Sequence, residues 1–227
     1  MSAIQPIPKK IHYVWFGGNP LPQGMQVLVD EWKRLMPEFE VCEWTEKNID
    51  VTVHPWMERM HSEKKYAFAS DYARLMVLRE HGGIYLDTDI SIKKSFAPFI
   101  GEQCFWSFEY DHFLSTAIIG CRPGHPITDA LLTLYDQRES EIVNNVLVTK
   151  YFIDTFPEFR LNNRDQVVGG DMRIMPKEYF ILPTYQKDKG YSRHLANNQW
   201  KPATPGRFRQ GKFVRSIIRE PLFYKLY

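Results

Sequence analysis

The first half of the chain alternates strand patterns with helical patterns, and this alternation restricts the possible folds more than any other feature. Strand patterns occur at residues 11–16, 39–44 and 84–86, with helical patterns over about 25–35 and 65–78. Strands that alternate with helices are typical of a parallel sheet covered by helices. Further strands are expected at 105–108, 116–120, 173–175 and 179–182, with helices at 126–135 and about 142–156. The sequence therefore predicts an α/β fold with a largely parallel central sheet flanked by helices.

The length and composition of the chain fit one globular domain. Its 227 residues are enough to bury a sizeable core. Hydrophobic residues make up 44% and charged residues 25%, which is unlike disordered or coiled-coil chains. Because no repeat, low-complexity stretch or linker divides the sequence, we expect one domain over residues 1–200, followed by a basic tail over 201–227.

The cysteines and the N-terminus favour a cytoplasmic protein. Cys42, Cys104 and Cys121 are odd in number and widely spaced, and they form neither a C-x-x-C pair nor a zinc-binding spacing. Reduced thiols are therefore expected. Residues 1–10 lack the apolar segment of a signal peptide, and no apolar run approaches the roughly 20 residues that cross a bilayer.

Charge is distributed unevenly along the chain. The net charge is +2, but residues 201–227 hold seven basic side chains against one acidic side chain, so the remainder carries −4. A basic tail indicates contact with an anionic partner, such as the inner face of the plasma membrane. Phe213, Val214, Ile217 and Ile218 fall at helical spacing, which is compatible with an interfacial helix. A helix docked on the body of the protein, with its charges in water, is the alternative.

Two carboxylates follow the apolar strand 84–86. Asp87 and Asp89 stand two residues apart, so in extended backbone both side chains project to the same side. Nearby carboxylates repel unless a cation or a proton lies between them, and a hard divalent ion also leaves positions free for substrate phosphates. Such an ion would neutralise charge on a leaving diphosphate. A solvated surface turn is the alternative for a D-x-D sequence taken alone.

A charged pair interrupts the helix predicted over 65–78. Asp71 and Arg74 are three residues apart and therefore share one face of that helix. A surface ion pair, worth about 0–1 kcal/mol, is the simple interpretation. Because the neighbouring side chains are apolar or small, we instead predict that the pair borders a cleft.

Three segments of the first half form an ordered pattern. They are IPKKIHYVWFGG at 7–18, ASDYARL at 69–75 and GGIYLDTD at 82–89. In order and spacing they resemble glycosyltransferase family 32, the sugar-binding D-x-D group, and the catalytic domains of large clostridial glucosylating toxins. The resemblance is strong over residues 7–95 and looser through 124–126, 175–180 and 194–200. Many relatives carry an asparagine in the segment where this chain has Leu114-Ser115-Thr116.

The resemblance implies a Rossmann-like GT-A fold and a retaining glycosyltransferase that uses Mn²⁺ or Mg²⁺. The implied donor is a nucleotide-diphosphate sugar, with a UDP-sugar favoured, and the implied acceptor is a glycan or lipid-linked glycan in capsular polysaccharide synthesis. Trp15 should stack on the base, and Asp89 should be a firmer metal ligand than Asp87. The residues implied for catalysis are Asp87, Asp89 and Arg74, for donor binding Trp15, Asp71, Arg74, Tyr85, Asp87 and Trp200, and for the metal Asp89, Asp87 and His194. A purely structural role for His194 is the alternative.

Two other functions stay open at this stage. A metal-dependent phosphohydrolase would use the same two aspartates but would need further grouped ligands, whereas the seven histidines are scattered along the chain. A non-catalytic protein that binds sugar nucleotides or glycans would keep the cleft without turnover. No nucleic-acid partner is expected.

Overall fold

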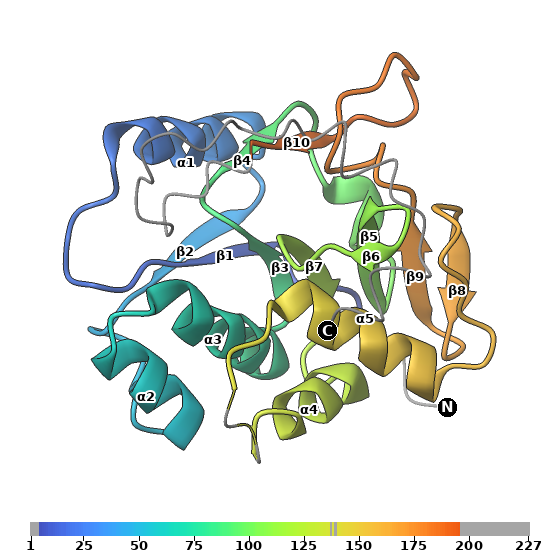
Figure 1. Cartoon of the computed structure of the whole chain (residues 1–227). Helices are drawn as coiled ribbons and strands as arrows, with labels where there is room; N and C mark the ends of the chain where they lie inside the picture. Colours follow the sequence, from blue (N-terminus) through green and yellow to red (C-terminus); the bar gives the residue numbers. More distant parts are fainter. Residues whose placement is uncertain (1–4, 137, 139, 196–227) are drawn as a thin grey trace, which may run out of the picture.

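The computed structural model describes residues 5–136, 138 and 140–195, which form a central sheet with helices on both faces (Figure 1). The helices are α1 (Gln23–Leu35), α2 (Pro55–Ser62), α3 (Tyr66–His81), α4 (Pro126–Thr133) and α5 (Asn144–Thr155), with a short 3-10 helix at Ala97–Phe99. The strands are β1 (Lys10–Val14), β2 (Glu40–Trp44), β3 (Gly83–Leu86), β4 (Ile90–Ile92), β5 (Cys104–Tyr110), β6 (Phe113–Leu114), β7 (Ile118–Cys121), β8 (Gln166–Val168), β9 (Met172–Met175) and β10 (Ser192–His194). None of the helices among these residues is both long enough and apolar enough to span a bilayer.

The main sheet mixes parallel and antiparallel pairs. Its strand order among the described residues is β2-β1-β3-β7-β5-β9-β8, with β6 paired to β5. Strand β1 runs parallel to β2 and β3, and β5 runs parallel to β9, but β7 is antiparallel to both β3 and β5. The predicted α/β class is confirmed, whereas the prediction of a largely parallel sheet was wrong. The connection from β5 to β7 contains no helix, and a short connection can only join antiparallel strands.

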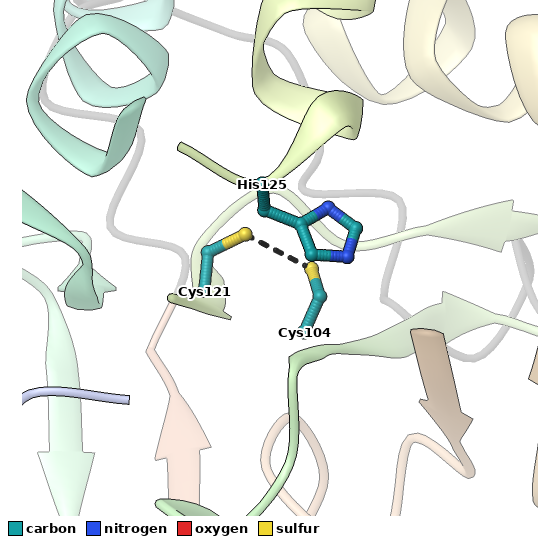
Figure 2. Close-up of side chains that lie close together, drawn as sticks. All are labelled: Cys104, Cys121 and His125. Atoms are coloured by element: carbon teal, nitrogen blue, oxygen red, sulfur yellow. Dashed lines mark hydrogen bonds between the residues drawn. The ribbon is translucent and has the colours of Figure 1, made fainter. Parts of the chain in front are cut away.

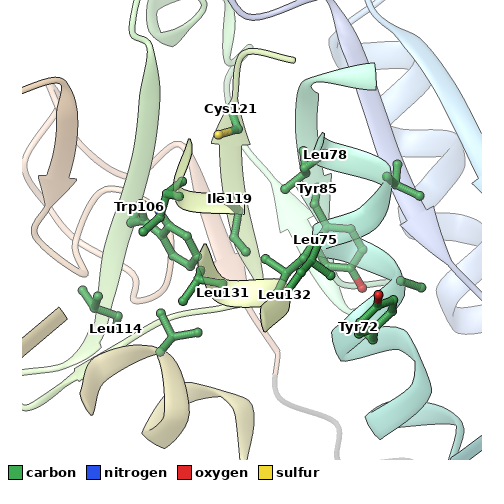
Figure 3. Packing of buried hydrophobic residues seen from close by; sticks show 14 of the residues in the cluster. Tyr72, Leu75, Leu78, Tyr85, Trp106, Leu114, Ile119, Cys121, Leu131 and Leu132 are labelled. Carbon is green, nitrogen blue, oxygen red and sulfur yellow. The ribbon is translucent and has the colours of Figure 1, made fainter. Parts of the chain in front are cut away.

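Both faces of the sheet are buried, and this explains why its strands have continuous apolar sequences. On β3, Tyr85 points into a core cluster formed with α2, α3, α4 and α5, while Ile84 and Leu86 point into a second cluster formed with α1. Figure 3 shows Tyr85 and Ile119 packed with Leu75 of α3 and Leu131 of α4. A strand buried on both faces loses the alternation of polar and apolar residues.

The apolar segment 179–182 does not form the predicted strand. The backbone amides of Ile181 and Leu182 donate to the carbonyl of Lys177, so the segment is built from local turns. Its aromatic side chains pack against the short 3-10 helix, with the rings of Phe180 and Phe99 in edge contact at a centroid distance of 5.0 Å. Burial, not strand pairing, accounts for the apolar sequence here.

The two glycines that end α3 are required by close packing as well as by backbone conformation. Gly82 has a φ of 59°, and a Cβ atom there would lie 2.5 Å from the Cδ atom of Pro123. Gly83 has a φ of 100°, and a Cβ atom there would lie 2.7 Å from Nε2 of His12. Left-handed conformations of this kind favour glycine. The turn therefore brings β3 directly against β1.

His12 is buried as a neutral ring beneath this turn. Its Nε2 lies 2.8 Å from the carbonyl oxygen of Gly82, which can only accept, so Nε2 carries the proton. The indole N–H of Trp44 donates to Nδ1 over 3.0 Å, which requires that nitrogen to be unprotonated. Burial lowers the pKa of His12 from 6.5 to about 4, despite the hydrogen bond to Gly82. A second proton would remove the bond from Trp44 and leave a buried charge.

Acid should therefore destabilise the fold through His12. The unfolded chain takes up the proton near pH 6.5, whereas the folded protein takes it up only near pH 4. Stability from the neutral ring is thus complete above the higher value and is lost as the pH falls to the lower one, by about 3 kcal/mol. Urea unfolding at pH 7 and pH 4 should show this loss in the wild type and not in His12→Gln, whose amide can still donate to Gly82. Equal losses in the two proteins would show that His12 does not contribute.

Candidate active site

The ends of three parallel strands form one edge of the site. Trp15 follows β1, Thr45 follows β2 and Asp87 follows β3, so all three residues lie at the carboxyl edge of the sheet. Open α/β sheets bind their ligands at this edge. A hollow of about 650 Å³ opens there, lined by Trp15 and residues 18–21 on one side and by Glu43 and residues 45–47 on the other. Trp15 therefore lines a cavity, and its stacking on a nucleotide base stays a prediction.

The loop after Trp15 is held by a hydrogen bond network from neighbouring elements. The amide of Gly17 donates to the carboxylate of Glu46 over 2.6 Å, and Nε2 of His61 lies 2.8 Å from the same oxygen. The indole N–H of Trp15 donates to the carbonyl of Asn19 over 2.8 Å. These contacts fix the wall of the hollow before any ligand binds.

Arg74 is the buried centre of the site. Only 4% of the residue is exposed, and its guanidinium lies 2.8 Å from the carboxylate of Asp71 and 3.4 Å from that of Asp87. It also donates to the backbone carbonyl of Thr116 over 2.7 Å and lies over the ring of Tyr85 at 4.6 Å. Through the side chain of Arg74, helix α3 thus contacts two acidic residues and the segment before β7.

Asp71 is the more buried of the two carboxylates that contact Arg74. Its side chain is 15% exposed, and the amide of Asn144 donates to it over 3.2 Å. Burial raises the pKa of Asp71 to about 6, with Arg74 opposing the rise and Asp87 adding to it. The ion pair on α3 is therefore part of the site and not a solvated surface pair.

The second half of the chain reaches the two aspartates by strand pairing. Strand β10 pairs antiparallel with β4, which places His194 opposite Ile90, and the amide of Leu195 donates to the carbonyl of Asp89 over 3.0 Å. Nε2 of His194 consequently lies 3.2 Å from the carboxylate of Asp89. Figure 1 shows β10 lying beside β4 next to α1. One side-chain atom each from Asp87, Asp89 and His194 lie within 4.8 Å of one another.

His194 stands between two acidic side chains. Nδ1 lies 3.8 Å from the carboxylate of Glu109, on the side opposite Asp89. Burial alone would lower the pKa of His194, but the contact with Asp89 and the charges of Glu109 and Asp87 raise it to about 9. The acidic neighbours therefore favour the protonated, positively charged form of the His194 ring.

A continuous chain of polar contacts surrounds the site. From Asp89 it passes through His194 to Glu109, which accepts a hydrogen bond from the amide of Asn145. The oxygen of that amide accepts a hydrogen bond from Thr116 over 2.6 Å, and the carbonyl of Thr116 contacts Arg74. Arg74 in turn contacts the carboxylate of Asp87. We call these residues the polar belt. They connect α3, α5, β5 and β10 around the carboxylates of Asp87 and Asp89.

Comparison with known proteins identifies the class of this site. Residues 22–106 match the family described as glycosyltransferase sugar-binding region containing DXD motif. The chain therefore contains a sugar-binding region similar to that of D-x-D glycosyltransferases. An uncharacterized glycosyltransferase of Acanthamoeba polyphaga mimivirus is 26% identical over 86% of this chain and 84% of its own length. The inositol phosphoceramide mannosyltransferase 3 of Schizosaccharomyces pombe is 27% identical over 53% of this chain, which spans 35% of the yeast protein.

A solved structure shares the fold of this glycosyltransferase. The PaToxG glycosyltransferase superposes with a TM-score of 0.56 and 20% sequence identity, over 66% of this chain and 70% of its own. The family resemblance and the GT-A type of fold predicted from the sequence are thereby confirmed.

The site brings together most of the residues that the sequence singled out. Asp71, Arg74, Asp87, Asp89 and His194 meet directly, whereas Tyr85 is 2% exposed and directs its hydroxyl onto Asp87 over 3.0 Å. Tyr85 therefore orients Asp87 from within the core and does not line the open site. Trp200 lies outside the described residues. No sequence motif singled out Asn144 and Asn145, which begin α5 and donate to the carboxylates of Asp71 and Glu109. The available signal for this role was a pair of adjacent asparagines at the start of a helix, where their usual role is local capping.

The acidic cluster of this glycosyltransferase has the chemistry of a divalent metal site. Two carboxylates and one imidazole form a mixed oxygen and nitrogen donor set, in which the carboxylates suit Mg²⁺ or Mn²⁺ and the imidazole suits transition metals. The raised pKa of His194 indicates that its proton supplies positive charge to the cluster, and a bound metal would take the place of that proton. Asp87, Asp89 and His194 therefore fit a metal such as Mn²⁺.

Removing the Arg74 cation should strongly destabilise this glycosyltransferase. Arg74→Met would leave Asp71 and Asp87 close together without their common partner, at a cost of about 3–5 kcal/mol. Arg79→Met is a matched control, because Arg79 lies on the same helix but pairs with Asp129 at 3.6 Å with side chains 45% and 61% exposed. The control should change stability by less than about 1 kcal/mol. Urea unfolding of both variants measures the difference, and similar losses would contradict the central role of Arg74.

Proposed function

We propose that this glycosyltransferase moves a sugar from a nucleotide-diphosphate-sugar donor to a glycan acceptor with retention of anomeric configuration, in a metal-dependent reaction. The observation that carries the proposal is the cluster of Asp87, Asp89 and His194 directly beside the buried Arg74. Acidic ligands for a divalent cation next to a fixed guanidinium suit a diphosphate leaving group. We favour Mn²⁺ over Mg²⁺, because one of the three ligands is an imidazole.

The geometry supports one orientation of the donor along the sheet edge. The nucleoside would occupy the hollow beside Trp15, where stacking on the indole contributes about 1–3 kcal/mol. The diphosphate would lie at Asp87, Asp89 and His194, and the sugar would extend toward Asp71. We favour a uridine diphosphate sugar as the donor.

The residues of the polar belt support the proposed retaining route. Bond cleavage develops positive charge on the sugar and negative charge on the leaving diphosphate, and a bound metal would neutralise part of the latter. Arg74 adds a buried positive charge that needs no reorganisation during the reaction. Asp71 is engaged by Arg74 and Asn144, and Glu109 by Asn145, so neither carboxylate is placed as a bare nucleophile. This supports attack from the face of the leaving group, with its phosphate accepting the proton of the acceptor hydroxyl.

The acceptor is proposed from the relatives. The yeast relative is named for mannosyl transfer to inositol phosphoceramide, which is a lipid. We extend this to a lipid-linked glycan in bacterial capsular polysaccharide synthesis, carried out in the cytoplasm at the inner face of the membrane. A phosphohydrolase is less well supported, because it would need further grouped ligands. Among the described residues, His194 is the one histidine that lies with the two aspartates.

Asp89→Ala should lower sugar transfer or donor hydrolysis by at least about a hundredfold, since a catalytic metal contributes several kcal/mol of charge stabilisation. A panel of nucleotide sugars with and without Mn²⁺ measures turnover, and calorimetric titration measures Mn²⁺ affinity separately. Sugar release that requires Mn²⁺ supports the proposal, whereas donor binding without release indicates a non-catalytic protein. Cleavage of simple phosphate esters would indicate a phosphohydrolase.

Asp111→Ala is the control for Asp89→Ala. Asp111 is a nearby acidic residue whose side chain is 58% exposed and pairs with Lys177, so its removal should leave turnover and Mn²⁺ affinity unchanged. Both variants should fold, although Asp89→Ala loses the largely buried contact with His194. Full activity in Asp89→Ala would overturn the metal assignment.

The basic tail over residues 201–227 lies outside the described residues, and its membrane contact stays a prediction. Vesicles that contain anionic lipid should retain the full chain more strongly than a 1–200 truncation, and added salt should reduce the difference. A sedimentation assay measures this. Equal retention of the two proteins would argue against a membrane role for the tail.

A further inference from the structure

Two of the three cysteines face each other inside the core. Cys104 lies on β5 and Cys121 on β7, and their sulfur atoms are 3.2 Å apart with both residues fully buried (Figure 2). Their separation in the sequence gave no indication of this pairing. Both cysteines are free in the structure.

The backbone register places this pair at the type of position where antiparallel strands approach most closely. Cys104 pairs with Cys121, and the amide of Arg122 donates to the carbonyl of the adjacent Gln103 over 2.9 Å. Because hydrogen-bonded and non-hydrogen-bonded pairs alternate, the cysteines occupy a non-hydrogen-bonded pair with Cα atoms about 4.5 Å apart. Disulfides span Cα separations of about 4.4–6.8 Å. A bond between the two sulfur atoms therefore requires no large movement of the backbone.

The cysteines also lie at a short joint of the sheet. The register between β5 and β7 contains two residue pairs, as does that between β1 and β3, whereas β3 pairs with β7 over four and β5 pairs with β9 over four. The joint separates the half that holds Trp15 and the two aspartates from the half that holds Glu109. A covalent bond there would connect the two halves that form the site.

We propose that Cys104 and Cys121 form a cross-strand disulfide under oxidising conditions. Two S–H bonds break and one S–S bond forms, while two electrons and two protons pass to a low-molecular-weight disulfide such as oxidised glutathione. The oxidant leaves as two thiols, so the exchange is balanced. Burial raises the pKa of Cys121, which keeps reactive thiolate scarce in the folded protein. The bond therefore forms most readily while the chain folds.

A metal ion is the competing occupant of this position, because His125 brings a third ligand atom within 4.8 Å of the two sulfur atoms. The ring of His125 argues against it. Nδ1 accepts a hydrogen bond from the amide of Ile127 over 3.2 Å at the start of α4, so in the neutral ring Nε2 carries the proton. Nε2 lies 3.3 Å from the carboxylate of Asp171. A protonated nitrogen is not a metal ligand, so the observed geometry favours the thiol pair alone.

The test is to refold the full chain from urea in a buffer of reduced and oxidised glutathione. After acid quenching, one thiol should remain titratable against three in the reduced protein, and a peptide that links Cys104 to Cys121 should be detected by mass spectrometry. Cys42→Ser should form the same bond, whereas Cys104→Ser should not. The oxidised form should unfold on the order of 5–10 °C higher than the reduced form, because the bond restricts the unfolded chain.

Two results would overturn the proposal. One is three titratable thiols, or only glutathione adducts, in the refolded wild type; this measurement does not depend on whether any variant folds. The other is a cobalt complex of the reduced protein with sulfur-to-metal absorption that is lost in both Cys104→Ser and His125→Ala, which would assign a metal site. Neither outcome bears on the glycosyltransferase reaction proposed above.

Discussion

The burial of Arg74 is the constraint on which the rest of the site depends. A guanidinium that is 4% exposed is costly unless its charge is matched, and Asp71 and Asp87 match it from two different elements. Its remaining donors reach the carbonyl of Thr116 and the backbone of its own helix. The end of β3, the start of β7 and the middle of α3 are thereby held in one arrangement. Because the fold itself satisfies this cation, it stands ready beside the D-x-D segment before a donor arrives.

The other wall of the site comes from residues that are distant in the sequence. The pairing of β10 with β4 brings His194 to Asp89, and the start of α5 brings Asn144 to Asp71 and Asn145 to Glu109. These contacts orient carboxylates that would otherwise repel one another. The result is a site with excess negative charge at one point and a fixed positive charge next to it, which is the arrangement that a metal-bound diphosphate would complete.

The mixed sheet explains why strands and helices were predicted better in the first half of the chain than in the second. Up to β3, parallel strands alternate with helices, and the boundaries of α1, β2 and α3 lie within a few residues of those predicted. Beyond β4, the sheet is built from the β5–β6–β7 hairpin and short strands such as β8. A strand buried on both faces has the same apolar pattern whether its neighbours are parallel or antiparallel, so sequence patterning could not reveal the direction of β7.

The sequence by itself determined the α/β class, the two carboxylates after a buried strand and the charged pair on α3, because each depends on periodicity within a short segment. It also singled out Trp15 and His194 through the family pattern. Only the tertiary structure decided that His194 meets Asp89, that two amides of α5 hold Asp71 and Glu109, and that Cys104 faces Cys121. These contacts arise from strand register and helix packing between segments far apart in the chain. No local pattern records that register, because it is set by how the whole core closes.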